Sequence, residues 1–404
     1  MKICILSSKM GTPQHLIVDE NSDTFSWIKE PPNDVWTYGA RDILMSLDVL
    51  AELHNIKIGN LFPEEHERAF RALCSQGSPG IPWHLAISPD RFRRSLQSII
   101  RDLQRVLEVH KETPYGQTFM HERKFILGLS KAYIDKDKIR TCMASETNAT
   151  VRSSLRTFFP KDDPLIAPPT EYSQVSTHTG RLTVTGGPQI LTLPSRCRDI
   201  ISSRFDGGEV VQVDFVAVEP RLARLVMGSV PKNDVYREIC DSLFSSDIDR
   251  KTAKIAVLCA LYGASTVRLQ RILGEGFDVR TIVRKLRDYF GVSALGVRLR
   301  SEVAESGVIV NWFGRKIYVE RTSTNVLVNN YIQSSAVDVT LLGFKGFTEK
   351  LEEMGMETTP IFLIHDALLL DVPPREGNLV RETASLGIDI PNIGNFPLKV
   401  DVIS

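Results

Sequence analysis

Two aspartates each interrupt a strongly apolar run of residues. Asp214 lies in VVQVDFVAV and Asp366 lies in FLIHDALLL. A buried carboxylate is costly unless a positive charge neutralises it, so each aspartate alone indicates a partner Arg or Lys, or a turn that exposes it. Two aspartates on neighbouring strands would instead hold two Mg²⁺ ions. Two such ions clamp the attacking and leaving oxygens of a phosphoryl displacement.

A basic helix is predicted over residues 249–265, DRKTAKIAVLCALYGAS. Four of its residues recur every four positions and so drift slowly around one face: Arg250, Lys254, Leu258 and Tyr262. Cations at the start of this face would hold phosphates, while the aromatic ring at its end would meet a base. The alternative is an ordinary amphipathic helix with a basic start and a tyrosine in the core.

Strands must position the two aspartates. Residues 207–218, GGEVVQVDFVAV, predict a turn followed by a buried strand. Residues 361–372, IFLIHDALLLDV, predict a β-hairpin, although its centre lacks an Asn-Gly or Asp-Gly turn. The two apolar arms of this hairpin indicate that both strands are covered on at least one face. Residues 233–290, which lie between these segments, are predicted to be mostly helical.

The N-terminal part is predicted to hold short strands and helices. Residues 1–60 predict strands followed by a helix over residues 36–54, WTYGARDILMSLDVLAELH. A later helix is predicted near residues 121–133. The loop PKDDPLIAPPT (160–170) contains four prolines in eleven residues, which predicts a domain boundary.

A long amphipathic helix is predicted to begin at Ser88 and Pro89, because serine is a common N-cap and proline suits the first helical position. Three arginines should lie away from its apolar face, free to meet a polyanion: Arg94, Arg101 and Arg105.

The overall charge gives no case for a nucleic-acid partner, because Lys plus Arg and Asp plus Glu both number 49. Local patches provide that case. Residues 90–111 hold six basic against three acidic residues, and residues 250–290 hold nine against three. A merely solvated helix face is the alternative for either patch.

The sequence predicts a cytoplasmic protein without a membrane partner. It contains no run of 18 or more apolar residues, and its N-terminus has too few apolar residues for a signal-peptide core. The six cysteines form no CxxC pair, which predicts reduced thiols.

Read in order, several segments resemble the motifs of the family A DNA polymerases, the bacterial DNA polymerase I type. DFVAVEPRLARL (214–225) resembles the first catalytic motif of that family and keeps its Asp214, Glu219 and Arg221. The other segments are YSQVSTHTGRLTVTGGPQILTLP (172–194), the helix RKTAKIAVLCALYG, FGRKIYV (313–319), NNYIQSSAVD (329–338) and LIHDALLLDV (363–372). The resemblance covers roughly residues 170–375.

The resemblance implies an α+β fold, a right-hand polymerase with an antiparallel-sheet palm, helical fingers and a helical thumb. It divides the chain into an N-terminal segment (1–62), thumb (63–169), first part of the palm (170–228), fingers (229–310) and second part of the palm (311–404). Residues 1–60 are too few for a proofreading exonuclease domain, so a compact form without one is expected. Residues 38–53 weakly resemble the last exonuclease motif, which predicts a degenerate remnant.

The resemblance also implies roles at the reaction centre. Asp214 and Asp366 would ligate both metal ions, with the Phe215 carbonyl as an extra ligand. Arg250 and Lys254 would hold the triphosphate, and Lys254 would protonate the leaving pyrophosphate.

Further roles concern the nucleotide and the nucleic acid. Tyr262 and Leu258 would lie where the templating base meets the incoming nucleotide, and Glu219 would block a 2′-hydroxyl. The resemblance places five residues on the primer and template: Arg181, Asn329, Gln333, His365 and Arg315. Such contacts suit an enzyme without sequence preference, because they read the backbone and minor-groove acceptors.

The sequence departs from the family pattern at several positions. Leu258 replaces the usual Phe or Tyr, which puts base stacking and sugar selection in doubt, and Ala367 replaces the Glu that usually follows His-Asp. Residues 215–217 and Pro220 also differ from the first motif. The short gap between Arg221 and Arg250 implies trimmed fingers.

The implied reaction is template-directed addition of deoxynucleotides to a primer 3′ end, with two Mg²⁺ ions as cofactors and Mn²⁺ as a substitute. Primer-template DNA and dNTPs would be the partners. A single-subunit RNA polymerase and a catalytically inactive DNA-binding relative remain alternatives. A gap-filling or damage-tolerant enzyme, or a compact viral or plasmid replicase, would also fit the trimmed fingers.

Overall fold

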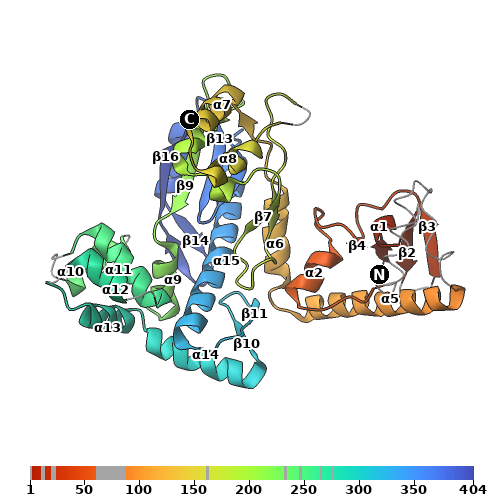
Figure 1. The fold of residues 1–404 in the computed structure, drawn as a ribbon, viewed down its shortest axis with the longest axis horizontal. Helices are drawn as coiled ribbons and strands as arrows, with labels where there is room; N and C mark the ends of the chain where they lie inside the picture. Colours follow the sequence, from red (N-terminus) through yellow and green to blue (C-terminus); the bar gives the residue numbers. More distant parts are fainter. Residues whose placement is uncertain are drawn as a thin grey trace. The chain divides into compact units, whose positions relative to one another are not determined.

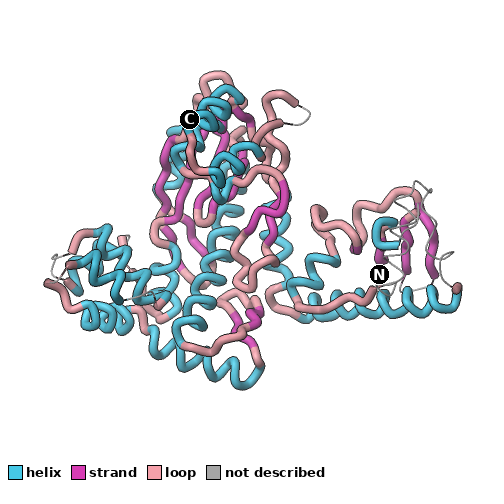
Figure 2. The backbone as a smooth tube through the Cα atoms, viewed as in Figure 1, coloured by secondary structure: helices cyan, strands magenta, loops and turns pink. Residues whose placement is uncertain are grey.

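The computed structural model describes residues 2–10, 14–19, 24–60, 88–160, 163–231, 234–244, 248–263, 266–274 and 276–404. The first part of the predicted thumb, residues 63–87, lies outside the described residues. The chain forms two compact units, Met1–Leu127 and Gly128–Ser404 (Figure 1). Figure 2 shows that both units mix helices and strands.

The first unit begins with a four-stranded sheet in the order β3-β2-β1-β4. Its elements are β1 (Lys2–Ile5), α1 (Ser7–Met10), β2 (His15–Asp19), β3 (Thr24–Ile28), β4 (Trp36–Tyr38) and α2 (Leu47–Leu53). The prediction of one helix over residues 36–54 is therefore wrong in its first half. Trp36–Tyr38 pairs with β1, and Gly39 then takes a φ of 116° that ends the strand. The helix begins only after Ser46, whose side chain accepts a hydrogen bond from the Val49 N–H.

The long helix predicted after Ser88 is confirmed as α5 (Pro89–Glu112), with Pro89 in its first turn. Its apolar stripe is buried, whereas Arg94, Arg101 and Arg105 are exposed. The next helix, α6 (Gly116–Leu127), ends earlier than the predicted range of 121–133, because Tyr133–Ile134 forms strand β5.

The second unit is organised around a four-stranded antiparallel sheet in the order β12-β13-β9-β16. Its strands are β9 (Glu209–Phe215), β12 (Thr359–Ile364), β13 (Ala367–Val372) and β16 (Leu398–Val402). The predicted β-hairpin is confirmed. A His365-Asp366 turn joins its arms, and His365 supplies the positive φ, 55°, that glycine or asparagine supplies in the usual hairpin turn.

Each face of this sheet is covered by different elements. On one face, the Phe215 ring packs 4.9 Å from that of Phe344 in the long helix α15 (Thr324–Glu353). On the other, Phe362 packs 6.0 Å from Phe158 within a buried cluster.

The part of the second unit that precedes β9 contains short helices and strands. They are β5 (Tyr133–Ile134), α7 (Lys136–Ser145), α8 (Ala149–Arg156), β6 (Glu171–Ser173), β7 (Thr183–Gly186), η1 (Ile190–Thr192), η2 (Ser195–Ile200) and β8 (Ile201–Ser202).

The proline-rich loop lies inside the second unit and is not a boundary between compact units. The Ile134 N–H donates to the Leu165 carbonyl, and the Ala167 N–H donates to the Ala132 carbonyl, both at 2.9 Å. These backbone bonds hold the loop to the chain that precedes it. The observed division falls earlier, between Leu127 and Gly128.

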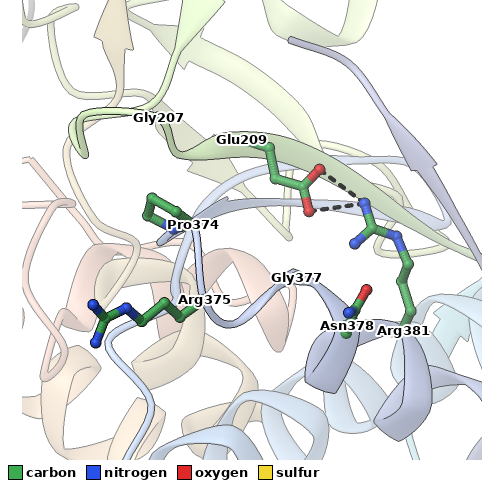
Figure 3. A pocket seen from close by; sticks show the side chains of 7 residues that line it. All are labelled: Gly207, Glu209, Pro374, Arg375, Gly377, Asn378 and Arg381. Atoms are coloured by element: carbon green, nitrogen blue, oxygen red, sulfur yellow. Dashed lines mark hydrogen bonds and ion pairs between the residues drawn. The ribbon is translucent and has the colours of Figure 1, made fainter.

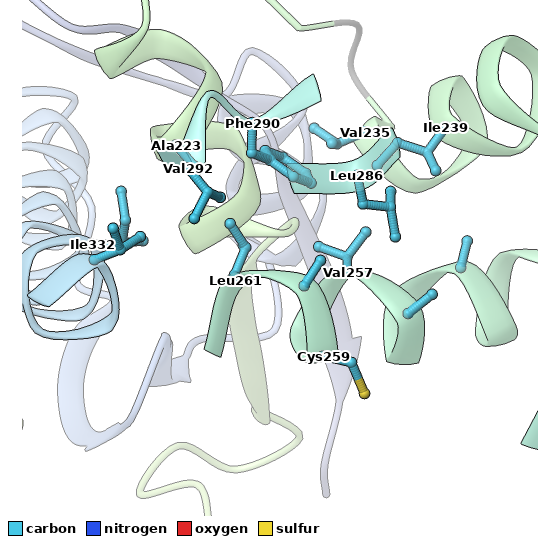
Figure 4. Close-up of a cluster of buried hydrophobic side chains, with 14 of the residues drawn as sticks. Ala223, Val235, Ile239, Val257, Cys259, Leu261, Leu286, Phe290, Val292 and Ile332 are labelled. Carbon is cyan, nitrogen blue, oxygen red and sulfur yellow. The ribbon is translucent and has the colours of Figure 1, made fainter. Parts of the chain in front are cut away.

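The predicted helical region after β9 is confirmed. It contains α9 (Val218–Val226), α10 (Val235–Leu243), α11 (Arg250–Tyr262), α12 (Thr266–Leu273), α13 (Val279–Tyr289) and α14 (Val292–Ser306). Figure 4 shows Val257 and Leu261 of α11 facing Leu286 of α13 and the neighbouring Phe290, all buried in one cluster. This packing fixes which face of α11 is left for solvent.

Smaller elements complete the second unit. They are β10 (Val308–Val310), β11 (Lys316–Tyr318), α16 (Gly377–Ser385), β14 (Ile388–Ile390) and β15 (Gly394–Phe396). Throughout the residues that the structure describes, every helix is too short or too polar to cross a bilayer.

Two glycines of α15 give a paired test of how tightly this helix contacts the sheet. A Cβ at Gly343 would lie 2.7 Å from Cζ of Phe215, whereas a Cβ at Gly346 would meet nothing within 4 Å. We expect Gly343→Ala to lower the free energy of unfolding by about 1–3 kcal/mol, through overpacking. Gly346→Ala should raise it by up to about 1 kcal/mol, through helix propensity. Urea denaturation measures both, and equal effects would contradict the packing described.

Candidate active site

Strand pairing brings the two predicted catalytic aspartates together. Asp214 is the penultimate residue of β9, and its cross-strand partner on β13 is Ala367, the residue after Asp366. The Phe215 N–H donates a 3.0 Å hydrogen bond to the Asp366 carbonyl. The ends of the two central strands therefore bring Asp214 and Asp366 together at one end of the sheet.

Several charged groups act on the carboxyl of Asp366. Partial burial raises the pKa of its carboxyl above the ordinary value, although the residue as a whole is exposed. The charge of Asp214 raises this pKa further, whereas Lys254 and Arg181 oppose the rise. Two like charges at close range would be relieved by a cation between them.

The donor set suits a hard divalent cation that keeps much of its water. Among the residues that the structure describes, no group of three or more His, Cys, Asp or Glu side chains gathers at one point. Mg²⁺ is commonly held by one or two carboxylates, with waters and phosphate oxygens as its other ligands. Asp214 and Asp366 fit that pattern, and the backbone of Phe215 adjoins them.

Asp214 is held by two side chains that sequence reasoning missed. Gln212 Nε2 donates to Asp214 Oδ2 at 2.8 Å, and Lys399 Nζ lies 3.2 Å from the same oxygen. Strand alternation gave a signal for Gln212, which lies two residues before Asp214 on the same face. Lys399 comes from β16, and its pairing with Asp214 depends on a register that the sequence does not reveal.

Helix α11 presents the predicted face. Its Asp249 cap accepts from the Thr252 N–H at 2.8 Å, and Gly263 ends it with a φ of 69°. The face is least buried at its start, where Arg250 and Lys254 are exposed, while Leu258 and Tyr262 are half-buried.

The guanidinium of Arg250 is engaged by groups of α10. Arg250 Nε donates to Asp234 Oδ2 at 2.7 Å, and the guanidinium lies 5.3 Å from the centre of the Tyr236 ring. A phosphate would therefore compete with a carboxylate for Arg250, whereas the charge of Lys254 acts on Asp366.

Tyr262 and Glu219 are joined across two helices. The Tyr262 hydroxyl donates to the Glu219 carboxylate, which connects α11 to the first turn of α9. Burial raises the pKa of Glu219, and the Tyr262 hydrogen bond opposes the rise. The chain reaches this position through Ala217, whose φ of 56° turns it sharply out of β9.

The residues predicted to contact the primer and template lie on helix α15, in the loop around Arg181 and at the hairpin turn. Asn329 and Gln333 lie one turn apart on α15, and Gln333 Oε1 accepts a hydrogen bond from Thr179 Oγ1 at 3.1 Å. Arg181 is exposed in the same loop as Thr179. His365 lies at the hairpin turn and is exposed. The pKa of its imidazole is lowered mainly by partial burial of the ring, and further by the charges of Arg181 and Arg198.

Arg315, predicted as a primer or template contact, is buried in this structure. Its side chain is only 3% exposed, and its Nη2 donates to the Gln174 carbonyl at 2.7 Å. Gly180 packs so closely that a Cβ there would lie 2.4 Å from the guanidinium. Arg315 is therefore buried against the loop that carries Arg181, and its role as a primer or template contact stays a prediction.

A separate pocket lies at the other end of β9, lined by Gly207, Glu209, Pro374, Arg375, Gly377, Asn378 and Arg381 (Figure 3). Arg381 there forms an ion pair with Glu209 at 2.8 Å, and Arg375 points away from that pair. This pocket therefore lies at the opposite end of β9 from Asp214, away from the predicted reaction centre.

The raised pKa of Glu219 predicts a pH-dependent stability effect. The folded protein holds this proton to a higher pH than the unfolded chain, so stability falls as pH rises from about 4.3 through the raised pKa. Glu219→Gln cannot ionise and still accepts the Tyr262 hydrogen bond. We expect its melting temperature, relative to wild type, to increase between about pH 4 and pH 8. A constant or decreasing difference would contradict the burial of this carboxyl.

The sequence is similar to known DNA polymerases. The family model for DNA polymerase family A matches residues 144–403. The DNA polymerase of Mycobacterium phage L5 is 29% identical over 219 residues, which cover 52% of this chain and 35% of the phage protein. DNA polymerase I of Caldicellulosiruptor bescii is 24% identical over 269 residues, which cover 58% and 31%. The chain spans about a third of the length of these relatives.

A solved structure shares the fold. It is the POL domain of Pol1 from M. smegmatis in complex with a DNA primer-template and dNTP. It matches with a TM-score of 0.63 at 14% identity, covering 99% of this chain and 94% of that one. The matched family model covers well over half of the sequence, from the helices before the sheet to the last strand. The chain belongs to DNA polymerase family A.

Proposed function

We propose that this chain is a DNA-templated DNA polymerase that adds deoxynucleotides to a primer 3′ end by two-metal-ion phosphoryl transfer. The observation that carries the proposal is the pairing of β9 with β13, which places Asp214 beside Asp366. Lys254 acts electrostatically on the same carboxylate. Family membership supports this reading, since the relatives are DNA polymerases.

The carboxylates of Asp214 and Asp366, with the Phe215 carbonyl, would hold two Mg²⁺ ions, and Mn²⁺ would substitute. When bound, such ions lower the pKa of the primer hydroxyl and stabilise charge on the phosphoryl oxygens. The two carboxylates would thus hold the ions at the end of the central strands, and the primer 3′ end would lie beside them.

Helix α11 would bind the incoming nucleotide. Arg250 would exchange its Asp234 partner for the triphosphate, and Lys254 would contact phosphate oxygens directly. As negative charge develops on the departing pyrophosphate, the Lys254 ammonium can supply a proton. The positive charge at the start of α11 would thus serve both to bind the triphosphate and to assist departure of the pyrophosphate.

The far end of the same face would select base and sugar. Tyr262 would lie where the templating base and the incoming nucleotide meet, and Glu219, which it binds, would exclude a 2′-hydroxyl. Leu258 offers no ring for stacking at the middle of the face, so this face would discriminate less by stacking than one carrying an aromatic residue there.

DNA would be held by backbone and minor-groove contacts. In the second unit we assign these contacts to Arg181, Asn329, Gln333 and His365. In the first unit the exposed arginines of α5 would contact phosphates, and binding should weaken as salt rises. The solved relative bound to a primer-template and dNTP supports these partners.

We assign the right-hand subdomains as follows. The sheet β12-β13-β9-β16 with α15 would be the palm, α10–α14 the fingers, and α5 with α6 the thumb. Residues 1–62 would be a degenerate exonuclease remnant without 3′–5′ proofreading. The helices α7 and α8, within the range 63–169 predicted as thumb, belong to the second compact unit.

Primer extension tests this proposal. Wild-type protein with Mg²⁺ should extend a DNA primer, and Asp214→Asn or Asp366→Asn should lower the rate at least about a thousand-fold, because several kcal/mol of charge stabilisation are lost. Asp389→Asn, which neutralises an exposed carboxylate on β14, should extend at the wild-type rate.

Parallel reactions separate the alternatives. Faster incorporation of rNTPs than dNTPs would indicate an RNA polymerase. Binding to duplex DNA without extension in Mg²⁺ or Mn²⁺ would indicate an inactive relative. Undiminished extension by Asp214→Asn would refute the assigned reaction centre, and removal of a mismatched primer end would refute the lack of proofreading.

A further inference from the structure

We infer that Gln212 is a positioning residue for Asp214, and that the charge of Lys399, which contacts the same carboxylate, sets how tightly the site binds a divalent cation. The inference rests on the proposed function, because it assumes that Asp214 is a metal ligand. Neither side chain belongs to the motifs that carry the family resemblance.

The geometry concerns one oxygen of the carboxylate. Gln212 Nε2 donates to Asp214 Oδ2 at 2.8 Å, and Lys399 Nζ lies 3.2 Å from that same oxygen. Among the described residues, both contacts are to Oδ2 and leave Oδ1 available. A carboxylate held in this way cannot rotate without breaking both contacts, so Oδ1 keeps a fixed direction.

Each of the two side chains is itself anchored. Gln212 Oε1 accepts from Arg198 Nη1 at 2.7 Å, which fixes the amide so that its NH₂ group points to Asp214. Lys399 Nζ also lies 2.9 Å from Asp401 Oδ2. The resulting chain of contacts, Arg198–Gln212–Asp214–Lys399–Asp401, runs along one face of β9 and β16, whose register pairs Lys399 with Asp214 and Asp401 with Gln212.

Gln212 and Lys399 differ in charge, so their effects on cation binding should differ in sign. Gln212 is neutral and only orients Asp214. The Lys399 ammonium repels a cation at the same carboxylate, and Ala367, the opposite neighbour of Asp214, brings no compensating negative charge. Lys399 is 56% exposed, so solvent reduces this repulsion without removing it.

The test measures Mn²⁺ binding to the whole chain without DNA or nucleotide, from the electron paramagnetic resonance signal of free Mn²⁺. Gln212→Met should bind Mn²⁺ about tenfold more weakly. Lys399→Met should bind it about three- to tenfold more tightly, and Lys399→Arg should match wild type because the charge remains. Lys345→Met removes a lysine that pairs with Glu349 on α15, and it should leave Mn²⁺ binding unchanged.

A second readout separates positioning from simple support of the fold. Gln212→Met should lower kcat and raise the Mg²⁺ concentration for half-maximal rate while leaving the KM for dNTP unchanged. Gln212→Asn, whose amide is one methylene too short to reach, should reproduce the loss if the Met variant does not fold. Unchanged Mn²⁺ affinity in both folded Gln212 variants, or weaker binding by Lys399→Met, would overturn the inference.

Asp214→Asn distinguishes this inference from the proposal beneath it. If Asp214→Asn binds Mn²⁺ as wild type does, the proposed metal site itself is wrong. If Asp214→Asn loses binding while the Gln212 and Lys399 variants match wild type, only the roles assigned to Gln212 and Lys399 are wrong.

Discussion

Backbone pairing between β9 and β13 is the constraint on which the proposed chemistry depends. It places Asp214 beside Ala367 and therefore beside Asp366, although the two aspartates are far apart in the sequence. Repulsion between the carboxylates opposes this arrangement and contributes to the raised pKa of Asp366. The packing of the sheet must therefore offset that repulsion, and the tight contact of Phe215 with α15 is part of what does so.

Positive charge around the pair comes from separate elements. Lys399 reaches Asp214 from β16, while Lys254 of α11 and Arg181 of the preceding loop act on Asp366. The positive charge at the pair therefore depends on the packing of three separate elements. A centre of this kind is electrostatically prepared for anionic substrates before any substrate binds.

Local patterns in the sequence predicted the elements of the site better than their environment. The two apolar arms identified the hairpin around Asp366. The four-residue spacing of Arg250, Lys254, Leu258 and Tyr262 identified one face of α11. Trp36–Tyr38 was misassigned to a helix, because pairing with β1 overrode local apolar spacing. The setting of Lys399 depends on strand register, and the burial of Arg315 depends on the close approach of Gly180, neither of which a single sequence encodes visibly.

The central claim is that Asp214 and Asp366 share divalent cations. Crystals of the protein with primer-template DNA, dNTP and Mn²⁺ would test it most directly, through the anomalous scattering of manganese. The account predicts anomalous peaks within about 2.0–2.5 Å of oxygen atoms from both aspartates. Peaks that contact only one aspartate, or carboxylates too far apart to share an ion, would contradict it.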